Sequence, residues 1–110
     1  MTRIVSRTLR WDPLTGADGF RLYWGPSDTV FDYTQPSVDF SPPPPIGASG
    51  KHEVNLASIP ALAALPEGTY DLAVTGFDAA GNEGNFAEVE NVPLDFVAPG
   101  AVTGLEVVAG

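Results

Sequence analysis

The sequence predicts an all-β protein, an antiparallel β-sandwich of about seven short strands. Apolar and polar residues alternate over several short segments, as they do in half-buried strands. Turn signals recur roughly every ten residues, and the 110-residue chain holds 12 Gly and 11 Pro. Only residues 57–65 favour a helix, and Pro60 limits that helix to about one or two turns.

The first predicted strands lie in residues 5–11 and 20–25, with a turn cluster between them. Pro36 interrupts the aromatic residues that follow, so this stretch forms a short edge strand or an irregular loop. The four prolines at 42–45 must be extended, because each ring fixes φ. We interpret them as a stiff loop that guards a sheet edge.

Three more strands are predicted at residues 51–56, 69–77 and 85–94, and the second of these has the clearest alternation. The side chains on the inner faces of the predicted strands form the expected core. They are Leu9, Trp11, Phe20, Leu22, Trp24, Val54, Leu56, Tyr70, Leu72 and Val74.

The segments "TLRW", "DGFRLYWG" and "LPEGTYDLAVTGFDAAGNEG" occur in an order that resembles a bacterial fibronectin type III domain, an immunoglobulin-like sandwich. Trp11 matches the tryptophan that ends the second strand of that family. "GFRLYW" matches the third strand, and "LPEGTY" matches the turn and tyrosine that precede the sixth. The resemblance covers Thr8 to Val92 and implies that the Tyr70 hydroxyl bonds backward to main chain near Leu65.

The domain is expected to span residues 1–95, followed by a linker and tail at 96–110. In this family a first strand precedes the tryptophan strand, whereas only "MTRIV" is available here. The tail carries "P-x-x-V-T-G-L-x-V", which is similar to the opening of such domains. We therefore interpret the chain as one repeat of a tandem array in a larger exported protein. The resemblance implies an extracellular, cell-surface or periplasmic location, with no signal peptide in this segment.

Composition disfavours several functions. The formal charge of −9, from 14 acidic and 5 basic residues, opposes binding to nucleic acids and anionic membranes. The absence of Cys excludes disulfides, thiolate zinc sites and cysteine nucleophiles. No stretch approaches the roughly 20 apolar residues of a membrane span. His52 is the only histidine. A triad would also need a nucleophile and a carboxylate around it, and a zinc site would need more nitrogen or sulfur ligands than the chain has, so we expect no enzyme, cofactor or metal.

Two acidic groups were considered as sites. Asp78, Asn82 and Glu83 offer the oxygens that calcium accepts, but Gly81-Asn82 also suits a hairpin tip, which we favour.

Glu88 and Glu90 share one strand face, and Asp71 lies on the sheet that they join. A chain this short lacks the loops for a glycosidase cleft. These three carboxylates are therefore interpreted as a solvated face.

Aromatic residues outside the predicted core could have three roles. Tyr23 and Phe77 face away from the core, while Phe31, Tyr33 and Phe40 flank the proline run. They could cover the outer sheet beneath the loop, anchor a protein partner, or stack against sugars. The leading hypothesis is a non-catalytic spacer and protein–protein interaction module. The alternative is a carbohydrate-binding accessory module.

The tail "AVTGLEVV" has the alternation of a strand without a domain of its own. We expect it to pair with a sheet edge, either of its own chain or of a neighbouring copy. The second case would give a strand-exchanged homo-oligomer. The predicted interaction residues are Tyr23, Phe31, Tyr33, Phe77, Val102, Leu105 and Val107.

Overall fold

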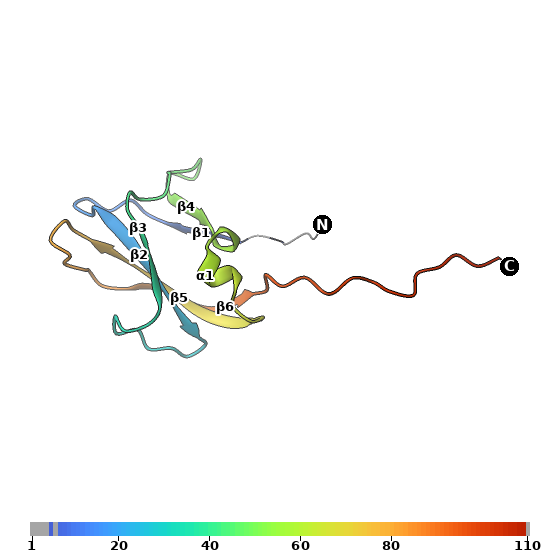
Figure 1. Cartoon of the computed structure of the whole chain (residues 1–110). Helices are drawn as coiled ribbons and strands as arrows, with labels where there is room; N and C mark the ends of the chain where they lie inside the picture. The colour runs from blue at the N-terminus through green and yellow to red at the C-terminus, as the bar shows by residue number, and fades with distance from the viewer. Residues whose placement is uncertain (1–4, 6, 110) are drawn as a thin grey trace.

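The computed structural model describes Val5 and residues 7–109, and is built mainly from strands (Figure 1). Parts of the predicted first strand and of the tail, at residues 1–4, 6 and 110, lie outside the described residues. In chain order, the elements are β1 (Thr8–Trp11), β2 (Gly19–Pro26), β3 (Ser37–Phe40), β4 (His52–Asn55), a 3₁₀ turn η1 (Leu56–Ser58), α1 (Pro60–Ala63), β5 (Gly68–Phe77) and β6 (Ala87–Leu94).

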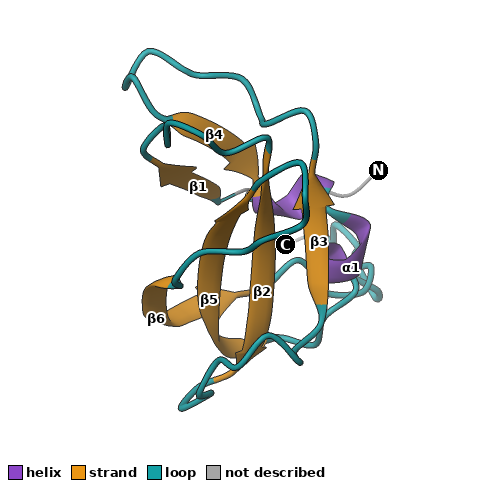
Figure 2. Ribbon diagram, turned by 90° about the vertical axis from the view of Figure 1, so that its left-hand side faces the viewer, coloured by secondary structure: helices purple, strands orange, loops and turns teal. Residues whose placement is uncertain are grey.

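The strands form two antiparallel sheets (Figure 2). One sheet has the order β1-β4, and the other has the order β3-β2-β5-β6. The central pair, β2 and β5, is in register from Gly19 opposite Phe77 to Pro26 opposite Tyr70. The all-β, antiparallel prediction is confirmed. The described residues contain six strands, because the tail forms none.

One hydrophobic core lies between the sheets, and all ten predicted core residues belong to it. Leu22 and Leu72 are almost fully buried, whereas Leu9 and Trp11 are only partly covered. Four further buried members were not predicted: Ile59, Leu62, Leu94 and Phe96. The packed part of the chain therefore includes Phe96, which the sequence places in the linker.

The predicted helical stretch forms η1 and α1, which close one end of the core. The side chain of Asn55 caps η1 by accepting a 3.0 Å hydrogen bond from the Ala57 N–H. Pro60 occupies the first turn of α1, where its missing N–H leaves no intrahelical bond unmade. Leu62 is the buried residue of this helix and joins it to the core.

A tyrosine corner fixes the start of β5. The Tyr70 hydroxyl donates a 2.7 Å hydrogen bond to the Pro66 carbonyl, one residue beyond the position expected at Leu65. This part of the sequence prediction is confirmed.

The proline loop covers the outer edge of β4. The Pro45 carbonyl accepts a 3.2 Å hydrogen bond from the Glu53 N–H, and the Pro44 carbonyl lies 2.7 Å from Nδ1 of His52. Ile46 also forms an isolated bridge with His52. These contacts satisfy an edge that would otherwise present unpaired backbone groups.

Candidate interaction site

An apolar groove opens between the free edges of the two sheets. A hollow of about 250 Å³ lies between β1, β5 and β6, and a second of about 260 Å³ continues past the end of β1. Both hollows include the side chains of Trp11, Val74 and Ala87. Leu9, Leu72 and Val89 complete the apolar wall of the first hollow, and Val89 is 44% exposed. Arg10 and Glu88 also contribute to its lining. We call the six apolar residues the β1/β6 groove.

The β1 edge of this groove carries free backbone groups. The Leu56 N–H donates a 2.8 Å hydrogen bond to the Arg7 carbonyl, which places this pair at a hydrogen-bonded position of the β1-β4 ladder. Bonded and non-bonded positions alternate in antiparallel pairs. The backbone groups of Thr8 and Arg10 therefore point away from β4. Within the described residues, no strand pairs with that edge.

Trp11 also has an unmet hydrogen bond. Its indole N–H is the one buried side-chain polar group, among the residues described, that has no partner. Such a donor costs about 1–3 kcal/mol when it remains unpaired. Strand alternation and the resemblance both predict Trp11 in the core, and no sequence signal marks it as part of an open groove.

The outer face of the larger sheet is covered, not exposed. Tyr23, Phe31 and Ala73 form a second buried cluster, packed against Phe86. Tyr23 and Phe31 are only 2% and 8% exposed, because the loop after β2 folds over them. Of the three roles considered for these two aromatic residues, packing is the one that their burial favours.

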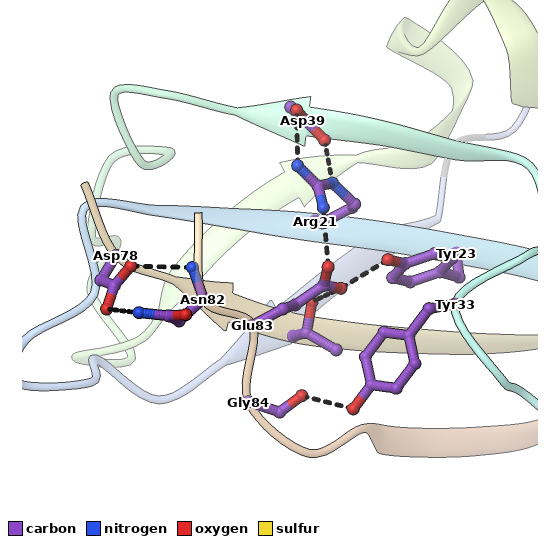
Figure 3. Close-up of polar contacts among 9 residues, drawn as sticks. Arg21, Tyr23, Tyr33, Asp39, Asp78, Asn82, Glu83 and Gly84 are labelled. Carbon is purple, nitrogen blue, oxygen red and sulfur yellow. Dashed lines mark hydrogen bonds and ion pairs between the residues drawn. The ribbon is translucent and has the colours of Figure 1, made fainter. Parts of the chain in front are cut away.

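The other two aromatic candidates, Tyr33 and Phe77, make different contacts. Tyr33 is 47% exposed and stacks on Phe86 at a centroid distance of 4.3 Å. Its hydroxyl donates a 2.9 Å hydrogen bond to the Gly84 carbonyl (Figure 3). Phe77 instead lies under the guanidinium of Arg21, 5.0 Å from its ring centroid. The four predicted aromatics therefore do not form one exposed, coplanar platform.

Glu83 is the centre of a polar network on this face (Figure 3). Its carboxylate accepts hydrogen bonds from Tyr23 and Thr75 and a 2.7 Å charge-assisted bond from Arg21. Arg21 also holds Asp39 of β3 through two nitrogens. The side chain of Glu83 is only 12% exposed, so the network ties β2, β3 and β5 to the hairpin loop.

The pKa values in this network follow from burial and charge. Burial raises the pKa of Glu83, but hydrogen bonds from Thr75 and Tyr23 and the charge of Arg21 outweigh it, so its pKa is lowered. The hydrogen bond from Arg21 lowers the pKa of Asp39. Burial and the hydrogen bond to Glu83 raise the pKa of the Tyr23 hydroxyl. The network is therefore most stable with charged carboxylates and a neutral phenol.

The turn after β5 is a hairpin tip. The Asp78 carboxylate accepts bonds from the Asn82 main-chain N–H, at 2.8 Å, and side-chain amide, at 3.0 Å. Gly81 has a φ of +88°, whereas Asn82 is not among the residues with positive φ. Glu83 turns inward onto Arg21, away from Asp78. In the described part of the chain, no three His, Cys, Asp or Glu side chains are close enough to hold a metal ion.

Asp71 departs from the solvated face that was expected. It is 2% exposed, and it accepts backbone hydrogen bonds of 3.1 Å from Thr29 and 3.0 Å from Asn91. Asn91 has a φ of +56°, beside the register shift where β6 bulges opposite β5. The hydrogen bonds from these two amides offset the free-energy cost of burying the carboxylate. The Asp71 side chain therefore has a structural role. Glu88 and Glu90 are exposed, as predicted.

The tail runs away from the sandwich as an extended segment without secondary structure (Figure 1). Its apolar residues are exposed to the extent of 83% for Val102, 86% for Leu105 and 99% for Val107. Pairing of the tail with an edge of its own chain is thus not observed. Neither helix among the described residues has the length and apolar character that a membrane crossing requires.

Comparisons with known protein families, curated proteins and solved structures give no significant match to this chain. The site must therefore be interpreted from its own geometry. That geometry offers one accessible apolar surface beside unpaired backbone groups, the β1/β6 groove.

Proposed function

We propose that the chain is a non-catalytic, fibronectin type III-like module that acts as a spacer and a protein–protein interaction surface in a larger exported or surface protein. Two packed antiparallel sheets and the Tyr70 hydrogen bond to Pro66 support the family assignment. The sequence motifs around Trp11 and Tyr70 support it as well.

The β1/β6 groove is the observation that carries this proposal. An extended peptide that adds to β1 would give hydrogen bonds to the free backbone groups of Thr8 and Arg10. Its alternate side chains would enter the groove beside Trp11 and Val89. Both requirements of strand addition, an unpaired edge and an apolar wall beside it, occur at one place.

Glu83, Asp71 and His52 each have structural partners, which favours binding over catalysis. Glu83 is shared among three donors, and Asp71 is shared between two backbone amides. His52 lies against the Pro44 carbonyl and packs between the rings of Trp11 and Phe20. None of these groups faces the β1/β6 groove as one of its lining residues.

The proposal can be tested by selecting displayed random peptides of about ten residues on the immobilised full chain. We expect enrichment of peptides with alternating apolar residues, because strand addition reads every second side chain. Val89→Lys places a charge in the groove and should abolish that enrichment. Val30→Lys is the matched control, since Val30 is an 85% exposed valine outside the groove.

Two results would contradict the proposal. One is that wild type enriches no alternating peptides, and the other is that Val89→Lys and Val30→Lys enrich the same ones. A glycan array probed with the same three proteins addresses the carbohydrate alternative. Binding of glycans by wild type, without peptide enrichment, would replace the proposal with that alternative.

A further inference from the structure

We infer that the occupant of the β1/β6 groove is the tail of a second copy of this chain, with Leu105–Val108 added as an antiparallel strand to β1. The inference rests on the proposed function, in which this groove receives an extended peptide. It specifies the partner and the direction of the added strand. Four observations lead to this assignment.

The first is the match between the tail and the edge that it would pair with. β1 has four residues, Thr8–Trp11, and so has the segment Leu105–Val108. Gly104 before it has a φ of +68°, which ends the preceding extended run and separates this segment from it. The segment is exposed throughout, so docking requires no local unfolding of the sandwich.

The second is side-chain alternation. Successive residues of a strand point to opposite faces, so Leu105 and Val107 share one face and Glu106 lies on the other. With Leu105 and Val107 directed into the groove, both meet Leu9, Trp11 and Val89, which are among its apolar lining residues.

The third is charge. On β1, the inward residues are Leu9 and Trp11, so the side chain of Arg10 lies on the outer face of the small sheet. Glu106 would lie on that same face when Leu105 and Val107 point inward. Arg10 is 55% exposed at its side chain and has only a 3.5 Å contact with Glu53. A cross-strand pair between Arg10 and Glu106 is therefore available in this register.

The fourth is strand direction, which selects a second copy over the chain's own tail. Val5 and Arg7 line a hollow together with Pro93, Asp95 and Val97, so β1 begins where β6 ends. The chain's own tail leaves at that point. If it folded back along the groove, it would run parallel to β1. An antiparallel strand must enter from the opposite end, which a neighbouring copy can supply, and antiparallel pairing is the more stable per residue.

Such pairing has two consequences for assembly. If two copies exchange tails, the complex closes as a symmetric dimer. If each copy donates its tail to the next, the contact is head-to-tail and the complex grows as an open chain. In both cases the same residues form the contact, so one set of variants tests the assignment.

The test is the mass of the full chain in solution, measured by light scattering over a range of concentrations. We expect wild type to associate, and Leu105→Lys/Val107→Lys to raise the apparent dissociation constant by about 100-fold, since each buried apolar side chain contributes at least about tenfold. Val30→Lys is the matched control, since Val30 is an 85% exposed valine outside the groove and the tail, and it should associate like wild type. All three residues are exposed, so folding is unaffected.

A charge exchange tests the register. Arg10→Glu and Glu106→Arg should each weaken association, and the double variant should restore it. Restoration supports the antiparallel pairing of β1 with Leu105–Val108. If the double variant associates as weakly as the two single variants, this register is wrong.

Other results would overturn the inference as a whole. Wild type could be monomeric at all concentrations, or Val30→Lys could weaken association as much as the double lysine variant. A synthetic peptide of residues 100–110 then separates the two proposals. If it fails to bind while selected library peptides bind in the groove, the inference fails and the proposed function stands. If neither binds, both fail.

Discussion

Arg21 of β2 and Glu83 of the hairpin loop, separated by 62 positions in the sequence, form a 2.7 Å ion pair. The pair is one arm of a network that also includes Tyr23, Thr75 and Asp39. It closes over an aromatic cluster that would otherwise lie on an open sheet face. The outer face of the larger sheet is therefore held by charge as well as by packing.

Glu83→Ala should destabilise the fold by about 3 kcal/mol, because it leaves the hydroxyls of Tyr23 and Thr75 and the Arg21 guanidinium without their acceptor. Urea unfolding followed by circular dichroism measures the change. Glu88→Ala is the control, since Glu88 is exposed and its loss should stay within about 0.5 kcal/mol. Equal effects of the two substitutions would show that the network does not stabilise the fold.

The free energy of unfolding should fall below about pH 4.5, the ordinary pKa of Glu. Because the folded pKa of Glu83 is lowered, its stabilisation is present above the unfolded pKa and is lost as pH falls through the folded value. Asp39, whose pKa Arg21 also lowers, adds to this loss. Unfolding of wild type and Glu83→Gln at pH 7 and pH 3 tests the attribution. The variant should show the smaller difference, and an unchanged difference would refute the role of Glu83.

Tyr70→Phe should cost about 1 kcal/mol, because the Pro66 carbonyl loses its 2.7 Å hydrogen bond. The measurement is the midpoint of urea unfolding at constant m-value. Tyr33→Phe provides the comparison, since its hydroxyl bonds the Gly84 carbonyl at the exposed hairpin loop, where water can replace it. A larger loss for Tyr33→Phe than for Tyr70→Phe would contradict the tyrosine-corner assignment.

Asp71→Ala should be the most damaging acidic substitution outside the network, by about 2 kcal/mol, because the Asn91 amide loses its acceptor and the Thr29 amide keeps only its 3.1 Å bond to the Pro26 carbonyl. Hydrogen exchange provides a specific readout. Both amides should exchange faster in this variant than in Asp95→Ala, whose carboxylate is exposed and accepts only from Val97. Unchanged protection of both amides would exclude this role.

The core and the positions of the strands along the chain could be predicted because they depend on local alternation. Every second residue of β5 is apolar from Tyr70 to Val74, and the core face follows directly. The alternation of residues 5–11 likewise places Trp11 on the inner face. The part of the Trp11 side chain that lines the β1/β6 groove could not be predicted, because its exposure depends on which strands lie next to β1 in space.

The outer face of the larger sheet shows the limit of alternation most clearly. The pattern puts Asp71, Ala73 and Thr75 opposite the core, which normally means exposure to water. They are nevertheless buried, since the loop after β2 and the chain before β6 return over them. Likewise, the residues around Glu83 predict a turn, which normally leaves a side chain in water. The ion pair with Arg21 depends on how β2 and the hairpin loop meet in space, so the sequence does not reveal it.

The free edge of β1 also bears on colloidal behaviour. At neutral pH, the −9 formal charge makes copies repel one another, which slows non-specific contact between free strand edges. The proposed tail pairing differs from such contacts, because it also buries apolar side chains and places Glu106 beside Arg10. Protonation of the carboxylates removes the repulsion and leaves the edge unchanged. The acidic surface thus slows non-specific association through the exposed edge of β1. Solubility should decline as this charge is neutralised.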